Sequence, residues 1–176
     1  MSDTLTTLLL KRRSCRRFKN DAVDPQKTEK LLQAAQLAPS GKNTRPWEFI
    51  VIQDRQTLQK LGNCRTPNQP FLPDAPLAIA VLADTAKTDT WIEDASIAAA
   101  FIQLQAEAMS LGSCWVQIRM RESNQNMSSE AYVKDLLHIP EHLAVLCIIA
   151  AGYPDESLPC HVYEEIDPDK IHTETF

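Results

Sequence analysis

The sequence predicts a single α+β domain, and three observations support this fold class. Segments with helical spacing of apolar residues alternate along the chain with short apolar runs that are typical of strands. Two of these runs, 77–83 and 143–151, are continuously apolar, as expected of strands buried on both faces. The 176 residues are 44% hydrophobic and 23% charged, and no linker divides them. We therefore expect residues 1–176 to share one core.

Apolar spacing and capping residues indicate where the elements begin and end. Helices are predicted around Leu5 to Leu9, from Asp24-Pro25 to Pro39, from Asp54 to Gly62, from Thr90 to Leu111, and from Ser128 or Ser129 to about His138. Strands are predicted at 47–52, 77–83, 114–118 and 143–151. The helix over 90–111 is apolar almost all round and should be closed by Gly112, so we expect it to contact both the core and an interface.

Composition excludes several classes of function. With glycine only at positions 41, 62, 112 and 152, the chain contains no GxGxxG, Walker or GxSxG motif. Its four histidines form no HExxH pattern and its five cysteines form no CxxC pair, so we predict neither a metal site nor a disulfide framework. The net charge of −5 disfavours nucleic-acid partners. The start of the chain resembles no leader and no run reaches membrane length, which favours a cytoplasmic protein without membrane contact.

Basic residues nevertheless gather in one short segment: Lys11, Arg12, Arg13, Arg16, Arg17 and Lys19. Arginine offers a planar fork of N–H donors, and Ser14 adds a hydroxyl among three such forks at Arg12, Arg13 and Arg16, a combination that suits a terminal phosphate. The alternative is that these arginines complement the dipole at the end of the first helix. On this segment alone the helix-end interpretation is favoured.

The segment from Pro39 to Trp47 contains a second group of ligand-type residues. Pro39 and Ser40 interrupt a helix, Gly41 allows a close approach of the backbone, and the Asn43 amide can both donate and accept hydrogen bonds. The edge of an isoalloxazine ring requires this mixture of groups. Taken singly, Asn43 is more often a turn residue that bonds its own backbone.

Both segments resemble known motifs of one family. Residues 12–18, RRSCRRF, resemble the RRSxRxF opening of the nitroreductase family, and residues 38–52 resemble its APSGxNxQPWxFIVV segment. The likeness continues at 74–77, 91–96, 111–115, 152–154 and 167–176, and thus covers nearly the whole chain. The resemblance implies a three-layer fold with a central mixed sheet flanked by helices. It also implies a homodimer in which a C-terminal tail, about 153–176, docks on the partner subunit.

The resemblance further implies a bound FMN and assigns residues to it. Arg12, Arg13, Ser14 and Arg16 are expected at the phosphate and ribityl end, with Arg16 also near the pyrimidine edge of the ring. The other expected contacts are Pro39, Ser40, Gly41 and Asn43 from the second subunit, Asn68 at the pyrimidine edge, and Trp115, Val116 and Gln117 beside N5.

Two departures from the family pattern affect this expected site. Gln117 and Ile118 stand where the family often has glycine. The family also commonly supplies a late arginine or lysine to the phosphate, whereas this chain has Glu165 in that region and leaves Lys170 as the nearest cation. We therefore expect the N-terminal cluster to hold the phosphate almost unaided.

The implied activity is transfer of hydride from NADH or NADPH through flavin N5 to a small electron-poor acceptor such as a nitroaromatic, a quinone or free flavin. Because the cofactor carries this chemistry, no catalytic side chain is predicted. The alternatives are specialised chemistry on the same scaffold, of dehalogenase or dehydrogenase type, and a non-catalytic flavin-binding sensor. Other conspicuous residues have structural interpretations: Cys114 and Trp91 as packing, Glu93 and Asp94 as partners of a helix dipole, and His172 as solvated.

Overall fold

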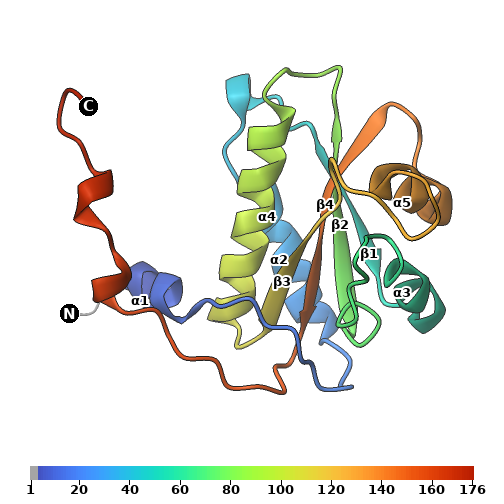
Figure 1. The fold of residues 1–176 in the computed structure, drawn as a ribbon, viewed down its shortest axis with the longest axis horizontal. Coiled ribbons are helices and arrows are strands. Elements are labelled where there is room, and N and C mark those ends of the chain that lie inside the picture. Colours follow the sequence, from blue (N-terminus) through green and yellow to red (C-terminus); the bar gives the residue numbers. More distant parts are fainter. Residues whose placement is uncertain (1–3) are drawn as a thin grey trace.

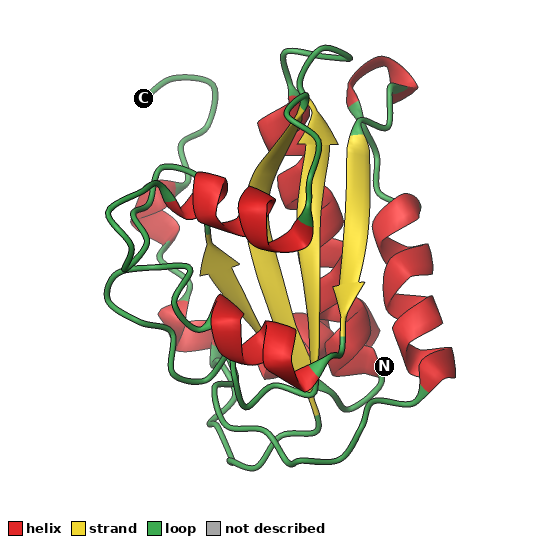
Figure 2. Cartoon of the chain, turned by 90° about the vertical axis from the view of Figure 1, so that its right-hand side faces the viewer, coloured by secondary structure: helices red, strands yellow, loops and turns green. Residues whose placement is uncertain are grey.

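A computed structural model describes residues 4–176, which form one sheet covered by helices on both faces. The strands β1 (Trp47–Ile52), β2 (Leu77–Asp84), β3 (Gly112–Gln117) and β4 (Leu143–Gly152) lie in the order β1-β2-β4-β3 (Figure 2). All three strand pairs are antiparallel. The sheet is therefore not mixed as expected, although an isolated parallel bridge joins Ser14 to Ser113. β2 and β4 are continuously apolar because both of their faces are covered, whatever their direction.

The helices form the two outer layers. α2 (Pro25–Gln36) and α4 (Trp91–Ala108) cover one face, and α3 (Arg55–Leu61) and α5 (Ser129–Leu137) cover the other (Figure 1). Each face of the sheet therefore has its own apolar cluster, with Ile102 and Ile149 in one and Val116 and Ile148 in the other. The α+β class and the three-layer arrangement expected from the sequence are confirmed.

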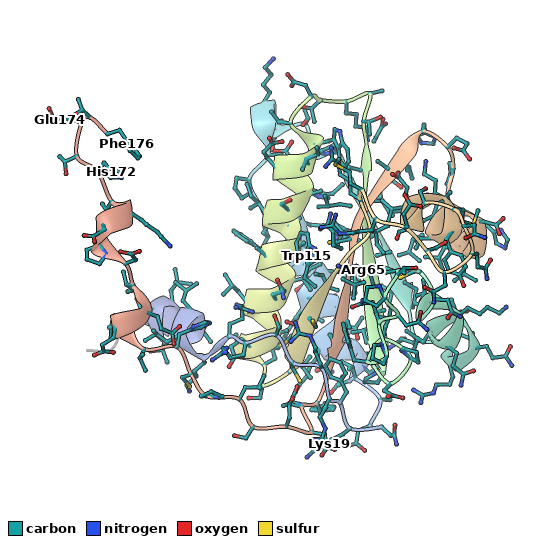
Figure 3. The ribbon with its side chains drawn as sticks, in the orientation of Figure 1. Lys19, Arg65, Trp115, His172, Glu174 and Phe176 are labelled. Atoms are coloured by element: carbon teal, nitrogen blue, oxygen red, sulfur yellow. The ribbon has the colours of Figure 1, made fainter. Side chains whose placement is uncertain are left out.

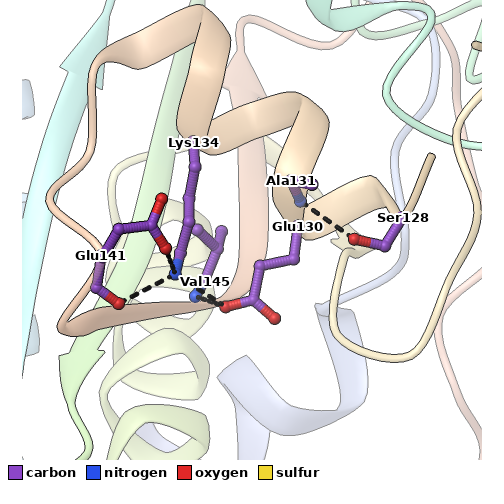
Figure 4. Close-up of polar contacts among 6 residues, drawn as sticks. All are labelled: Ser128, Glu130, Ala131, Lys134, Glu141 and Val145. Atoms are coloured by element: carbon purple, nitrogen blue, oxygen red, sulfur yellow. Dashed lines mark hydrogen bonds and ion pairs between the residues drawn. The ribbon is translucent and has the colours of Figure 1, made fainter.

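The predicted capping residues begin their helices. Asp24 accepts a hydrogen bond from the Gln26 N–H at 2.8 Å, and Asp54 accepts one from the Thr57 N–H at 2.8 Å. At α5, the Ser128 hydroxyl accepts from the N–H of Ala131 at 3.1 Å (Figure 4). These three helix starts depend on residues two or three positions apart, which is why the sequence predicts them well.

α5 is fixed to the sheet by charged side chains as well as by its apolar face. The Glu130 carboxylate accepts the N–H of Val145 in β4 at 3.0 Å and lies 3.8 Å from the Lys134 ammonium group (Figure 4). Lys134 also donates to the Glu141 carbonyl at 3.1 Å. α5 ends at Leu137 because His138 adopts a left-handed conformation with φ 54°.

The end of α4 differs from the prediction. The helix stops at Ala108, because Ser110 takes the left-handed conformation at φ 59° and the Leu111 N–H bonds back to the Ala106 carbonyl at 2.9 Å. Gly112 does not close the helix and is instead the first residue of β3. A Cβ there would lie 2.6 Å from the Cys15 sulfur, so Gly112 makes room for the arginine-rich segment.

The N-terminal helix and part of the C-terminal tail meet beside the body of the fold. α1 (Thr4–Lys11) and the tail from Tyr153 onward, with the short helices η2 (Tyr163–Glu165) and η3 (Pro168–Lys170), extend away from the sheet (Figure 1). The His161 N–H donates to the Leu10 carbonyl at 2.7 Å and joins them. Apolar side chains are partly exposed here, with Leu5 53% and Ile171 70% exposed. No helix within 4–176 is long and apolar enough to cross a membrane.

Candidate flavin-binding site

The arginine-rich segment leaves α1 and crosses the start of β3. The Cys15 N–H donates to the Ser113 carbonyl at 3.0 Å, beside the Ser14–Ser113 bridge. Burial raises the pKa of the neighbouring Cys114 thiol, while the positive charges of Arg16 and Arg12 and a hydrogen bond with Ser14 act in the opposite direction. Three of the four residues predicted at the phosphate thus act on the pKa of one buried side chain of β3. We call Arg12, Ser14 and Arg16 the N-terminal grip.

Arg13 is oriented differently from the N-terminal grip. Its Nη1 donates to the Pro159 carbonyl in the tail at 2.5 Å. A hydrogen bond from His161 lowers the pKa of Glu165, and the charge of Arg13 contributes to the same shift. In the described chain Arg13 therefore holds the tail, which the sequence did not indicate.

Glu156 is a residue of this region that the sequence did not indicate. Its Oε1 accepts hydrogen bonds from the backbone N–H of Arg16 at 2.6 Å and of Arg17 at 3.1 Å. These N–H groups lower the pKa of the Glu156 carboxyl, with the Arg16 bond contributing most. No local signal marks Glu156, because its partners lie about 140 positions earlier in the chain.

The loop from Pro39 to Asn43 is anchored to the first turn of α4. The Gly41 N–H donates to the Asp94 carboxylate at 2.8 Å, and the Thr90 hydroxyl donates to the same side chain at 3.2 Å. Asp94 is only 3% exposed, and a Cβ at Gly41 would lie 2.6 Å from the Thr90 hydroxyl oxygen. Asp94 was interpreted as a partner of the helix dipole, but its carboxylate holds this loop in place.

The rest of this loop is stabilised by local hydrogen bonds. The Ser40 hydroxyl accepts from the Arg45 N–H at 3.0 Å, and the Asn43 side-chain Oδ1 accepts from Arg45 Nε at 2.9 Å. Lys42, Asn43 and Arg45 all adopt positive φ, between 45° and 57°. Asn43 and Pro39 are exposed on the surface of the single chain. Asn43 thus has a local structural partner, as its turn interpretation expects, and still faces outward.

The loop and the N-terminal grip lie at opposite ends of α4 (Figure 1). Asp94 in the first turn holds the loop, whereas the grip lies against Ser113, which follows the last turn of the helix. α4 has 18 residues, and at about 1.5 Å per residue it separates them by about 27 Å. One chain therefore cannot bring the two groups to the same small molecule.

β3 offers an open backbone edge next to the grip. It is the last strand of the sheet, and the Ser113 carbonyl points outward because it accepts from Cys15. By the alternation of strands, Trp115 and Gln117 direct their backbone groups to the same side. The Trp115 indole N–H donates to Gln117 Oε1 at 2.9 Å, and Gln117 Nε2 donates to the Arg119 carbonyl at 3.0 Å. Figure 3 labels Trp115 beside α4.

The remaining predicted residues lie away from this edge or bond elsewhere. Val116 is fully buried, and its side chain packs in the core beneath α3 and α5. Asn68 accepts a hydrogen bond from the Asn124 amide, which connects the loop after α3 to the loop after β3. Lys170 is exposed in the tail and lies 3.7 Å from Asp167. The tail's far end, with His172, lies well away from the sheet (Figure 3).

Residues 9–65 and 61–153 match the model of the nitroreductase family. The chain belongs to that family. This nitroreductase is 46% identical to a solved FMN-dependent nitroreductase from Clostridium difficile R20291, with a TM-score of 0.93 and coverage of 96% of this chain and 98% of the other.

Two further relatives are named for different activities. A candidate NADH dehydrogenase/NAD(P)H nitroreductase of Archaeoglobus fulgidus is 36% identical over 172 residues, which cover 95% of each chain. An iodotyrosine deiodinase of Thermotoga neapolitana is 26% identical and covers 92% of this nitroreductase and 95% of its own length. Within residues 4–176, no group of three or more histidine, cysteine or acidic side chains could hold a metal ion.

Proposed function

We propose that this nitroreductase binds FMN and passes electrons from NADH or NADPH to a small electron-poor acceptor. The observation that carries the proposal is the N-terminal grip beside the open edge of β3. Two guanidinium groups and a hydroxyl provide charged and neutral donors for a phosphate, while strand N–H and C=O groups suit the polar edge of a flavin ring. The donor set therefore fits FMN. The relatives named above as FMN-dependent or NAD(P)H nitroreductases support the same assignment.

The cofactor site of the proposal needs two chains. A homodimer would bring the loop of one subunit, with Pro39, Ser40, Gly41 and Asn43, to the N-terminal grip of the other. The separation of the two groups by the length of α4 supports this arrangement. So do the apolar side chains of the tail that residues 4–176 leave exposed, including Tyr163, Ile166 and Ile171. On a partner's surface this tail would carry Lys170 away from its own subunit.

FMN, when bound, would supply the chemistry for hydride transfer from the nicotinamide and for reduction of the acceptor. The protein's part is to hold and orient it. Arg12, Ser14 and Arg16 would bind the phosphate, and the charge of Arg16 would also favour negative charge at the pyrimidine edge. Asn68 is proposed at that edge too, and the β3 segment 115–117 is proposed beside N5. This chemistry requires no side chain to act as acid, base or nucleophile.

The decisive experiment follows the flavin itself. The purified protein should be yellow or take up added FMN, and NADH or NADPH should bleach the bound flavin rapidly without oxygen. Stopped-flow traces with each donor, followed by a panel of nitroaromatics, quinones, free flavin and iodinated phenols, would assign donor and acceptor. A protein that takes up no FMN refutes the proposal, and one that binds FMN but is reduced by neither donor indicates a flavin sensor.

Dehalogenation is the second candidate, because the deiodinase relative covers nearly the whole chain. Its identity of 26% is lower than the 46% and 36% to nitroreductase-type relatives, so we place it second. Release of iodide from an iodinated phenol, faster than reduction of any nitroaromatic, would reverse this order.

A further inference from the structure

Glu156 contributes a negative charge to the surroundings of the N-terminal grip. Its Oε1 accepts the backbone N–H groups of Arg16 at 2.6 Å and Arg17 at 3.1 Å. Two consecutive N–H groups that converge on one oxygen fix the orientation of the peptide that joins them. The Arg16 side chain begins at this peptide, and its guanidinium Nη1 donates to the Ser14 carbonyl at 3.4 Å.

The main chain of this region is held independently of the Glu156 side chain. The Lys19 N–H donates to the Tyr153 carbonyl at 2.8 Å, and the Asp155 N–H donates to the Arg17 carbonyl at 2.9 Å. Loss of the Glu156 carboxylate would therefore leave residues 153–155 beside the arginine-rich segment. What it would release is the peptide between Arg16 and Arg17.

The negative charge of Glu156 disfavours a phosphate nearby if only Coulomb forces are considered. The two N–H bonds lower the pKa of the carboxyl, so Glu156 is negative near neutral pH. A carboxylate near a phosphate should weaken phosphate binding. A net benefit to phosphate binding must then come from the geometry that Glu156 imposes on Arg16.

We propose that Glu156 is a positioning residue that sets Arg16 for the phosphate and thereby makes the site prefer phosphorylated flavin to flavin without phosphate. The inference rests on the proposed FMN function. If charge alone mattered, removal of the Glu156 carboxylate should strengthen the binding of an anion. The positioning role predicts the opposite, that its removal weakens the binding of FMN. This difference in sign makes the role measurable.

The test compares FMN with riboflavin, which lacks the phosphate. Dissociation constants for both ligands are measured by quenching of flavin fluorescence on the purified full-length protein and on Glu156→Gln, Glu156→Asp and Asp155→Asn. Gln keeps the size of the side chain but loses the charge that strengthens both N–H bonds. Asp155 is the matched control, since it is the neighbouring carboxylate and its side chain is exposed.

We expect Glu156→Gln to weaken FMN binding roughly tenfold, the loss typical of a weakened charge-assisted hydrogen bond, and to change riboflavin binding less than about twofold. Glu156→Asp, whose shorter side chain cannot reach both N–H groups, should also lower the preference for FMN. Asp155→Asn should keep or slightly increase FMN affinity, because it only removes a negative charge. Both ligands are measured without NAD(P)H, so the readout is independent of turnover.

Two results would overturn the inference. Glu156→Gln that binds FMN as tightly as the unaltered protein, or more tightly, shows that charge dominates. An equal loss of affinity for FMN and for riboflavin shows a general structural role. If Glu156→Gln does not fold, the same comparison of affinities is made with Glu156→Asp. Failure of the unaltered protein to bind FMN refutes the proposed function itself, whereas FMN binding with an unchanged preference refutes only the role of Glu156.

Discussion

Replacement of Asp94 by alanine tests whether this carboxylate anchors the loop of residues 39–43. Asp94 is 3% exposed and accepts hydrogen bonds from the Gly41 N–H and the Thr90 hydroxyl. Hydrogen bonds to charged groups contribute about 1.5–3 kcal/mol each, so the loss of two should lower the free energy of unfolding by about 3 kcal/mol or more. Asp94→Asn keeps an acceptor for Gly41 and a polar partner for Thr90, and should cost about 1 kcal/mol.

The assay is urea unfolding followed by tryptophan fluorescence, at one fixed protein concentration. Glu93→Ala is the control, since Glu93 is exposed in the same helical turn and can act only through the helix dipole, worth about 0.3–1 kcal/mol. Equal losses for Asp94→Ala and Glu93→Ala would restore the dipole interpretation. A loss below about 0.5 kcal/mol for Asp94→Ala would refute the anchoring role.

Three more outcomes are expected. Arg16→Ala should weaken FMN binding about 10- to 100-fold, since it removes a charge-assisted contact. Arg13→Ala should weaken FMN binding less, because the Arg13 guanidinium bonds the Pro159 carbonyl. Fluorescence titration with FMN measures both affinities. Gly41→Ala should destabilise the protein by about 1–3 kcal/mol through contact with the Thr90 hydroxyl, and Thr90→Ala should restore part of the loss in urea unfolding. Folding lowers the pKa of the Glu156 carboxyl, so its contribution to stability is present above the ordinary pKa of 4.5 and is lost as the pH falls through the lowered pKa. The difference in free energy of unfolding between the unaltered protein and Glu156→Gln should therefore vanish in acid. A difference that persists in acid contradicts the assignment.

The fold was largely predictable because most of its signals are local. Asp24, Asp54 and Ser128 each bond a backbone N–H two or three residues ahead, so the capping pattern alone indicates where the helices begin. The direction of the strands was not predictable in the same way. Apolar runs such as 77–83 report burial on both faces, and burial does not distinguish parallel from antiparallel neighbours.

The sequence could name candidate site residues from the chain's own motifs, but it could not indicate the residues that support them from distant positions. Arg12, Ser14 and Arg16 were named from the sequence, and all three act on the pKa of Cys114, while their contact with FMN stays a prediction. Asp94 and Glu156 were missed as supports, because their partners lie 53 and about 140 residues away in the chain. A carboxylate that binds a backbone N–H across such a distance leaves no trace in spacing or composition.

The separation of the N-terminal grip from the loop of residues 39–43 by the length of α4 has a genetic consequence. In the proposed dimer every cofactor site draws one half from each chain. A mixed dimer of an Arg16→Ala chain and an Asp94→Ala chain then has one site with both halves damaged and one site with neither. A mixture of the two variants whose subunits exchange should consequently bind FMN better than either variant does on its own.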